Sequence, residues 1–577
     1  MAYVQISTQN CKNLALNIQE MIKIYSFDIF DTLLLRPYTD PQEIWNILEE
    51  QENCKGFAKF RKEADAKTYA RATKEDRETT IEEAYSIMPH KYQALMKKEI
   101  ELERKVLCAN PEMLEKWERA KSEGKKRILV SDMYLPQEII EDILIEKGIK
   151  GWDAFYLSRT YNARKTTGKL YEIMLRKEDV KPNEVQHIGD NIHSDVEVPQ
   201  ALGIHTVHYN KIVDIYIKIC PFARHLDQRL AGILALGYHN YTQTHKDKEK
   251  GFTYWHRFGY NIGGVLGYIY VSWLVNKAKQ LGYNKLLFVA RDGYVWKRIC
   301  EALYPEIETD YIYAPRITSI ALLGIIGHDP IALKNRKEYF DKHMQDINRS
   351  EIEKEYKQYA SQFNIDEHTA IVDGFSSAFS AQRLIEYVTG KNIFAFYEVA
   401  MAKMQHAAAL MQTNLYCPPF LHLTEFLFGA PENPIVGIKN LKPVYNQKVT
   451  NEELFKISHS QEIADAAVQC CKLLKASDYS FPKFGDFCDL FMQNLTDEDK
   501  EMLAQAKDAG DIEQKKFVSA IYKPRDTNFH IKKHQIGNFS YELNINTHNK
   551  THYFKLSRTQ YIHFVDNYSI EYDVYVK

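Results

Sequence analysis

The chain lacks a charge excess of either sign, because its 75 lysine and arginine residues nearly balance its 77 aspartate and glutamate residues. Without a basic excess, the composition gives no reason to expect nucleic-acid binding, and the function has to be sought in local sites. The nine cysteines include no C-x-x-C pair, and the sequence opens without a secretory signal pattern. We therefore expect reduced thiols in a cytoplasmic protein.

Internal repeats, low-complexity linkers and a clear membrane span are also missing. One uncharged segment, residues 258–276, contains four glycines and Asn261 and runs into another apolar strand pattern. This segment predicts a buried helix and no transmembrane segment. A chain of 577 residues is too long for one core, so we expect several domains, with a boundary at the lysine-rich residues 245–250.

Short apolar runs that end abruptly in polar residues dominate the first 230 residues. They occupy residues 22–27, 128–130, 154–157, 185–188 and 206–207, and they alternate with charged segments of helical character. This pattern predicts parallel strands joined by helices. In such a sheet the ligand binds at the carboxyl ends of the strands, which is where the polar residues lie.

Five polar residues at these strand ends form an ordered set. Asp28 follows the first run, Ser131 the second, Lys165 lies ahead of a later helix, and Asp190 and Asp195 follow the fourth run. A carboxylate, a hydroxyl, an ammonium and a carboxylate pair are what magnesium-assisted phosphoryl transfer requires. The set resembles the haloacid dehalogenase superfamily, most of whose members are phosphatases.

The resemblance implies a role for each member of the set. Asp28 would be the nucleophile that forms an aspartyl-phosphate, Ser131 and Lys165 would hold the phosphoryl oxygens, and Thr32 would contact the substrate. The implied ligands of Mg²⁺ are Asp28, the backbone carbonyl of Phe30, Asp190 and Asp195.

Phe30 departs from the pattern of this superfamily. Its phosphatases carry a second aspartate at this position, two residues after the nucleophile, as general acid and base. Such proton transfer typically contributes roughly 10²–10⁴-fold. Asp31, Asp132 or His193 could substitute, and the sequence leaves these three open. A degenerate domain that only binds phosphate is the alternative to an active phosphatase.

The segment between the first two strands reads as helical. Residues 40–43 and 80–83 each have the pattern of a capping box, which marks the start of a helix. The segment resembles the helical cap that this superfamily inserts after the nucleophile. A cap of this kind closes over small phosphorylated substrates and excludes water.

A second α/β pattern follows residue 250. Residues 285–296 and 369–381 both read as a strand, a turn and a helix, and such turns present backbone N–H groups to phosphate. The pair resembles type I phosphoribosyltransferases, which implies that Arg291 faces pyrophosphate and that Asp373 orients the ribose. The other residues implied to bind substrate are Asp292, Gly293, Arg316, Gly374, Ser376, Ser377 and Ser380. Ordinary strand-to-helix turns of another transferase or of a non-catalytic domain remain an alternative.

The chain is thus predicted to be an α/β protein with three parts. Residues 1–230 would form a Rossmann-like parallel sheet of the haloacid dehalogenase type, with its cap at about 36–120. Residues 250–435 would form the phosphoribosyltransferase-like domain. Residues 436–577 would form an extension of helices, beginning near residues 450 and 496, followed by a small antiparallel sheet that includes residues 539–545 and 568–576.

Together the two α/β domains resemble bacterial enzymes of capsule or O-antigen biosynthesis that install ribofuranose. One domain would transfer ribose 5-phosphate from phosphoribosyl pyrophosphate to a glycan acceptor, including a lipid-linked one, and the Mg²⁺-dependent phosphatase would then remove the 5-phosphate. Such an enzyme would be cytoplasmic or peripheral at the inner membrane. The alternatives are a sugar phosphatase with a non-catalytic or different glycosyltransferase partner domain, and a scaffold that only binds phosphorylated sugars.

Overall fold

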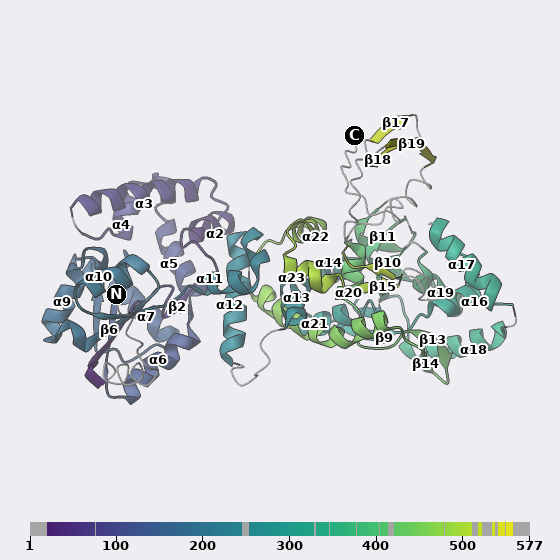
Figure 1. The fold of residues 1–577 in the computed structure, drawn as a ribbon, viewed down its shortest axis with the longest axis horizontal. Helices are drawn as coiled ribbons and strands as arrows, with labels where there is room; N and C mark the ends of the chain where they lie inside the picture. The colour runs from purple at the N-terminus through teal and green to yellow at the C-terminus, as the bar shows by residue number, and fades with distance from the viewer. Residues whose placement is uncertain are drawn as a thin grey trace. The chain divides into compact units, whose positions relative to one another are not determined.

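The computed structural model describes residues 20–557, except for residues 76, 245–252, 328–329, 346, 377, 403, 414–419, 478, 510–516, 522–532, 537–539 and 548–549. The chain divides into two compact units, Met1–Glu249 and Lys250–Lys577 (Figure 1). Each unit is built around its own five-stranded parallel sheet.

The sheet of the first unit has the strand order β5-β4-β1-β6-β7, and all four neighbouring pairs are parallel. Its strands are β1 (Ile24–Phe27), β4 (Lys126–Ser131), β5 (Ala154–Leu157), β6 (Val185–Gly189) and β7 (His205–His208). These strands coincide with the five predicted apolar runs. Because β1 lies in the centre, the residue after it lies in the middle of the carboxyl edge of the sheet.

Helices alternate with these strands and follow the last of them. They are α6 (Pro111–Ser122), α7 (Gln137–Glu146), α8 (Ser158–Tyr161), α9 (Lys169–Glu178), α10 (Val198–Ala201), α11 (Ile212–Ile219) and α12 (Gln228–Thr244). In α9, for example, Leu170, Tyr171 and Met174 have helical spacing, and all three pack in a core that also contains Ile24 and Ile128.

The predicted helical cap is present. Its helices α2 (Glu43–Gln51), α3 (Phe57–Lys74), α4 (Ile81–Ser86) and α5 (Leu95–Val106) lie in the chain between β2 (Leu34–Leu35) and β3 (Cys108–Ala109), which pair as antiparallel strands. A buried ion pair joins α3 to α5, because the guanidinium of Arg61 donates at 3.0 Å to the carboxylate of Glu99.

One of the two predicted capping boxes is confirmed. Thr80 and Glu83 exchange hydrogen bonds between side chain and backbone at the start of α4.

The other box is wrong. Helix α2 starts only at Glu43, and the carboxylate of Asp40 accepts from the N–H of Gln42 at 2.9 Å, as in an Asx turn ahead of the helix. The carboxylate of Glu43 does not accept from the backbone N–H of Asp40, as a capping box would require, because it binds the guanidinium of Arg229.

The sheet of the second unit has the strand order β12-β11-β10-β8-β9 and is also parallel throughout. Its strands are β8 (Lys285–Val289), β9 (Glu308–Ile312), β10 (Thr369–Ser376), β11 (Phe394–Ala400) and β12 (Ala407–Gln412). The chain runs outward from β8 to β9 and then returns to β10 on the other side of β8. This reversal is a topological switch point, where parallel sheets commonly bind ligands.

Both predicted strand–turn–helix units are present, at β8–α15 and β10–α19. The helices of this unit are α13 (Tyr254–Phe258), α14 (Gly264–Leu281), α15 (Tyr294–Leu303), α16 (Arg316–Leu323), α17 (Pro330–His343), α18 (Arg349–Ala360), α19 (Ser380–Thr389), α20 (Leu421–Leu427), α21 (Asn451–Ala476), α22 (Phe484–Gln493) and α23 (Asp497–Leu503).

The uncharged segment at 258–276 lies in α13, the π-helical turn η6 (Gly259–Gly263) and α14, and it is largely buried. A Cβ atom on Gly259 would lie 2.5 Å from the backbone oxygen of Ile463, so this glycine lets α21 approach closely. The prediction of a buried helix is confirmed. Across the described parts of the chain, every helix is too short or too polar to cross a lipid bilayer.

Smaller antiparallel pairings complete the second unit. They are the hairpin of β13 (Ile435–Lys439) and β14 (Lys442–Tyr445), the pair of β15 (Lys507–Ala509) and β16 (Phe517–Ser519), and the three-stranded sheet of β17 (Lys533–Ile536), β18 (Ser540–Thr547) and β19 (Lys550–Ser557). The last sheet agrees with the predicted small sheet near residues 539–545. The strand predicted at 568–576 lies outside the described residues.

Candidate active sites

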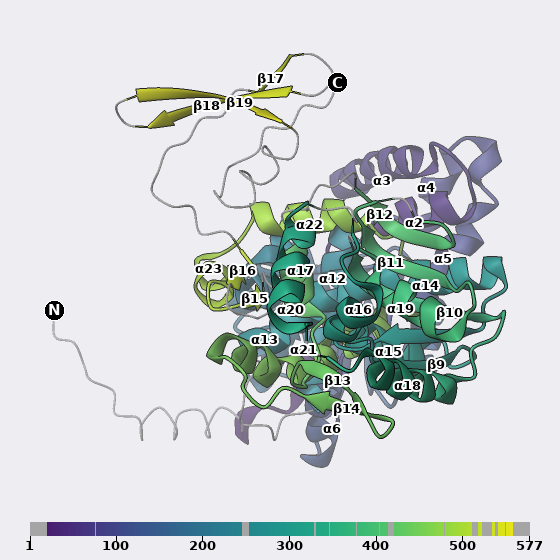
Figure 2. The same cartoon turned by 90° about the vertical axis from the view of Figure 1, so that its right-hand side faces the viewer.

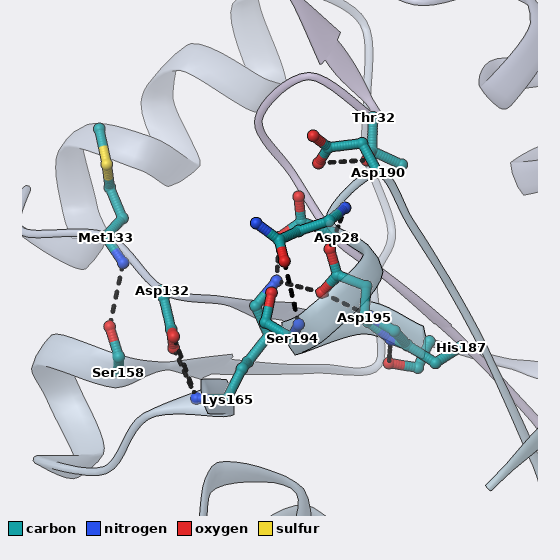
Figure 3. A network of polar contacts seen from close by, with 12 residues as sticks. Asp28, Thr32, Asp132, Met133, Ser158, Lys165, His187, Asp190, Ser194 and Asp195 are labelled. Carbon is teal, nitrogen blue, oxygen red and sulfur yellow. Dashed lines mark hydrogen bonds and ion pairs between the residues drawn. The ribbon is translucent and has the colours of Figure 1, made fainter. Parts of the chain in front are cut away.

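In the first unit, one lysine joins two buried carboxylates (Figure 3). Asp28 directly follows β1, Lys165 begins the short helix η2 (Lys165–Thr167), and Asp195 lies in η4 (Ile192–Glu197). The Nζ atom of Lys165 lies 2.6 Å from Oδ1 of Asp28 and 2.6 Å from Oδ1 of Asp195. The structure therefore brings together three residues that are far apart in the sequence.

A third carboxylate, that of Asp190, completes the group. It follows β6, accepts from the hydroxyl of Thr32 at 3.5 Å, and lies 3.3 Å from the ammonium of Lys211. One carboxylate oxygen from each of Asp28, Asp190 and Asp195 lies within 4.8 Å of the others. A buried set of carboxylate oxygens at this spacing fits a hard divalent cation such as Mg²⁺.

Burial and the neighbouring charges shift the pKa values of all three carboxylates. Burial raises the pKa of Asp28 to about 8, against the effect of Lys165 and with that of the other two carboxylates. Burial also raises the pKa of Asp190. Burial acts on Asp195 in the same direction, but Lys165 and His187 outweigh it and lower the pKa of this residue. A divalent cation beside Asp28 would favour its ionised, nucleophilic form.

Behind Asp195 lies a layer of polar side chains that the sequence interpretation missed. Nε2 of His187 lies 3.2 Å from Oδ1 of Asp195, and Nδ1 of the same ring lies 2.8 Å from the hydroxyl of Ser26. The hydroxyl of Tyr171 donates to the backbone oxygen of Ser194 at 2.8 Å. These contacts orient Asp195. A polar residue in an apolar strand, as at His187, was the available signal.

The glycine of the predicted strand end has a steric role. A Cβ atom on Gly189 would lie 2.5 Å from Cγ of Asp195. The other oxygen of this carboxylate accepts from the N–H of Asn191 at 3.0 Å. The fixed position of Asp195 therefore requires the absence of a side chain at residue 189.

Ser131 and Asp132 lie on the neighbouring strand end. Ser131 is the last residue of β4 and is buried. Both carboxylate oxygens of Asp132 accept from the backbone N–H of Lys165, at 2.8 and 3.1 Å. Asp132 thus positions the segment that carries Lys165 and uses both of its carboxylate oxygens to do so.

One face of the Phe30 side chain is covered by an arginine. The Phe30 ring is 9% exposed, and the guanidinium of Arg36 lies over it. Arg36 also donates to Glu103, and its Nη1 lies 3.3 Å from Oδ2 of Asp31. Asp31 has a left-handed backbone conformation with φ of 57° and lies close enough to Asp190 to raise its pKa.

Of the three substitutes considered for proton transfer, His193 lies least suitably. Its side chain is 62% exposed and contacts Glu197 at 3.1 Å. Both carboxylate oxygens of Asp132 already accept from the backbone N–H of Lys165. Asp31 is the candidate that lies on the nucleophile loop itself.

In the second unit, buried carboxylates gather at the carboxyl edge of the sheet. Burial raises the pKa of Asp373, on β10, to about 7, and nearby Asp292 adds to this rise. Glu398, on the adjacent strand β11, is 3% exposed, and its Oε1 atom has no hydrogen-bond partner among the described residues. Burial and Asp292 raise the pKa of Glu398 as well. Glu398 was missed by the sequence interpretation, although a charge within an apolar strand is a visible signal.

Arg291 has a partner of its own. Its guanidinium pairs with the buried carboxylate of Glu453 on α21, and its backbone N–H donates to the hydroxyl of Tyr311 at 2.6 Å. The turn around it is tight, because a Cβ atom on Gly293 would lie 2.5 Å from the backbone oxygen of Val289.

The turn between β10 and α19 is stabilised by hydrogen bonds between its own residues. The N–H of Gly374 donates to Asp373 at 3.0 Å, and the hydroxyl of Ser376 accepts from the N–H of Phe379 at 2.7 Å. Ser380 is the first residue of α19. Arg316, the first residue of α16, lies close enough to Asp373 to act on its pKa. Ser377 lies outside the described residues.

No protein-family model and no curated protein matches this sequence. Solved structures similar to the chain include an L-2-haloacid dehalogenase from Xanthobacter autotrophicus, with 17% identity over 32% of this chain and 77% of that one, and a TM-score of 0.25. A HAD family enzyme from Bacteroides thetaiotaomicron has 15% identity over 33% of this chain and 94% of its own, also with a TM-score of 0.25. Values this low assign no activity to the chain.

Proposed function

We propose that the first unit is a Mg²⁺-dependent phosphatase in which Asp28 is the nucleophile. The observation that carries this proposal is the buried group at the carboxyl edge of the sheet, where Lys165 joins Asp28 to Asp195 beside Asp190. Such a group supports attack on a phosphate monoester, whose charge must be neutralised before a carboxylate can approach it.

The reaction would proceed in two displacements. A carboxylate oxygen of Asp28 forms a bond to phosphorus while the bond from phosphorus to the alcohol oxygen breaks, and the alcohol leaves with a proton. Water then attacks phosphorus, releases inorganic phosphate and restores the carboxylate. Lys165 offsets the charge that develops on the phosphoryl oxygens, and Asp31 is assigned the proton transfer. Asp28, Asp190 and Asp195 would hold Mg²⁺, which supplies charge neutralisation.

The test of this unit is Asp28→Asn, assayed for phosphate release from aryl and sugar phosphates. An amide is a poor nucleophile, so release should fall to background while the circular dichroism spectrum stays unchanged. Asp142→Asn is a matched control, because Asp142 lies on α7 with a 68% exposed side chain. Phosphate release by Asp28→Asn at the rate of the control would contradict the assignment.

For the second unit we propose transfer of ribose 5-phosphate from phosphoribosyl pyrophosphate to a glycan acceptor, including a lipid-linked one, in the cytoplasm or at the inner membrane. The buried Asp373 beside a turn and a helix start, at the switch point of a parallel sheet, supports this proposal. The phosphorylated product would be the substrate of the first unit. Joining both activities in one chain raises the local concentration of that intermediate.

Incubation of the full chain with phosphoribosyl pyrophosphate, Mg²⁺ and candidate glycans, followed by mass spectrometry, tests the transferase. Wild type should add a ribosyl group, and Asp28→Asn should add a ribosyl phosphate. An intact donor with every acceptor would contradict transfer.

The ion pair between Arg291 and Glu453 favours a second candidate function, because Glu453 neutralises the positive charge that was assigned to pyrophosphate. In that candidate the first unit is a sugar phosphatase and the second unit only binds a phosphorylated sugar.

A further inference from the structure

Three arginines come together on helices α16, α17 and α19 of the second unit. Arg316 begins α16, Arg336 lies in α17 and Arg383 lies in the first turn of α19. Helix α16 packs against both of the other helices, as Figure 2 shows. Between α16 and α17 the contact is apolar and includes Ile320 and Phe340.

The position of this group is the carboxyl edge of the sheet. Arg316 follows β9, and Arg383 follows the turn after β10. A Cβ atom on Gly327 would contact Ala378 of that turn at 3.5 Å and Leu333 of α17 at 3.6 Å. The start of α17, one turn before Arg336, therefore lies against the β10–α19 turn.

Among the described residues, Arg336 is buried and has no ion-pair partner, whereas Arg383 is half-buried and Arg316 is exposed. Arg336 is 5% exposed, and its Nη1 atom is buried without a hydrogen-bond partner. Burial lowers the pKa of Arg336 to about 10, and the charges of Arg316 and Arg383 lower it further. Within the described ranges, no carboxylate forms an ion pair with any of the three, and Arg383 contacts only the sulfur of Met404, at 4.0 Å.

Such an arrangement is unfavourable in the free protein. Buried charges are ordinarily paired, and like charges in proximity repel each other. Further donors lie nearby: the buried hydroxyl of Ser319, one turn after Arg316, lacks a hydrogen-bond partner among the residues that the structure describes, and α19 begins three residues before Arg383. Arg316 also lies close enough to Asp373 for the two charges to interact, but the other groups named here are positively charged or can donate a hydrogen bond, so the ligand that they match is an anion.

We propose that Arg316, Arg336 and Arg383 form a binding site for a diphosphate group, either free pyrophosphate or the diphosphate of an ester. Three guanidinium charges exceed the charge of about −2 on a phosphate monoester and match the higher charge of a diphosphate better. The planar forks of arginine bind phosphoryl oxygens in pairs. This inference rests on the proposed function of the second unit and refines it, because it assigns the diphosphate of the donor to these arginines in place of Arg291.

Binding of inorganic pyrophosphate by the full chain, measured by isothermal titration calorimetry in EDTA, tests the site. Wild type should bind pyrophosphate, and its affinity should fall as the salt concentration rises. Arg336→Gln, Arg316→Gln and Arg383→Gln should each weaken binding at least about tenfold, as expected for a lost charge-assisted contact. Lys334→Gln is a matched control on the same helix, because Lys334 has a 75% exposed side chain. It should bind as wild type does.

Thermal unfolding without ligand is a second measurement, and it distinguishes a ligand-binding arginine from a structural one. Arg336→Gln should unfold at the same or a higher temperature than wild type, because it removes a repelled, unpaired charge. Arg336→Lys keeps the charge but loses the fork, so its affinity should lie between those of wild type and Arg336→Gln. If Arg336→Gln instead unfolds at a clearly lower temperature, Arg336 is structural and the site is overturned.

Other outcomes separate this site from the transferase. If wild type does not bind pyrophosphate, if the arginine variants bind it as tightly as Lys334→Gln, or if phosphate binds as tightly as pyrophosphate, the diphosphate site is wrong. If the wild-type protein binds pyrophosphate through these arginines but transfers no ribosyl phosphate, the site stands and the transferase proposal alone is wrong.

Discussion

The guanidinium carbon of Arg36 lies 4.8 Å from the centre of the Phe30 ring. The same guanidinium holds Asp31, the next residue along the nucleophile loop, so the residue that replaces the usual acid and the residue proposed to substitute for it share one partner. If Asp31 transfers the proton as proposed, this transfer depends on the loop around Arg36.

If Asp31 protonates the leaving alcohol, the effect of Asp31→Asn should depend on the leaving group. Hydrolysis of alkyl and sugar phosphates should fall roughly 10²–10⁴-fold, whereas hydrolysis of p-nitrophenyl phosphate, whose leaving group needs no proton, should change little. Asparagine tolerates the left-handed backbone at this position. Steady-state kinetics of both substrates measure the difference. An equal loss on both would show that Asp31 has a different role.

Lys165→Gln should destabilise the first unit as well as inactivate it. The substitution leaves the buried carboxylates of Asp28 and Asp195 without a counter-charge, and breaking a buried pair in this way costs about 3–5 kcal/mol. Urea unfolding measures the loss. Lys211→Gln is the comparison, because the Lys211 side chain is 43% exposed, and it should cost less than about 1 kcal/mol. Similar losses for the two variants would contradict the role of Lys165.

Removal of Mg²⁺ by EDTA should inactivate the protein reversibly, whereas substitution of Asp190 should inactivate it irreversibly. EDTA should stop phosphate release by wild type, and added Mg²⁺ should restore it, because the ligands are intact. Asp190→Ala should be inactive with or without Mg²⁺. Release of phosphate at an undiminished rate in EDTA would rule out a divalent cation at the three carboxylates.

The Arg291–Glu453 pair can be tested as a unit. Arg291→Ala should lower the free energy of unfolding by about 3 kcal/mol, because it leaves the 1% exposed side chain of Glu453 buried and unpaired. Addition of Glu453→Gln should recover most of this loss, as a double-mutant cycle would show. If the double variant recovers stability and also transfers ribosyl phosphate normally, Arg291 is structural. Recovery of stability without transfer would place Arg291 at the substrate.

Asp373 should make the stability of the ligand-free second unit depend on pH. Its pKa is about 7 in the folded chain and near 3.8 ordinarily, so the folded protein holds the proton more tightly. The free energy of unfolding should therefore fall as pH rises from about 4 to about 7, and then level off. Asp373→Asn should reduce this slope, leaving the part that comes from Glu398, and raise the melting temperature at pH 8. The exposed Asp341→Asn should behave as wild type, and an unchanged slope in Asp373→Asn would contradict the prediction.

The sequence was sufficient for the sheets and for part of the first site. Asp28, Asp190 and Lys165 could be found because strand ends and their order along the chain are visible in the pattern of apolar runs. His187 stands out as a polar residue in an apolar strand, but its role and those of Ser26 and Tyr171 could not be predicted, because their contacts join segments that only the folded sheet brings together.

The second unit shows the same limit more strongly. Both strand–turn–helix units were predicted, but Arg336 and Arg383 lie on helices that look ordinarily charged in the sequence. Among the described residues, only the burial of Arg336 without an ion pair and the proximity of the other two arginines distinguish this group. The capping box at residues 40–43 was wrong because a distant partner, Arg229, takes up Glu43.

Lys165 also has a consequence for how this protein matures. Many metal-binding domains reach their native state only when the ion arrives, because their ligands repel one another until then. Here an internal ammonium already spans two of the three carboxylates. If the first unit is the Mg²⁺-dependent phosphatase proposed above, it can thus fold on this internal counter-charge, and a cell short of Mg²⁺ would keep a folded protein that becomes active once the ion binds.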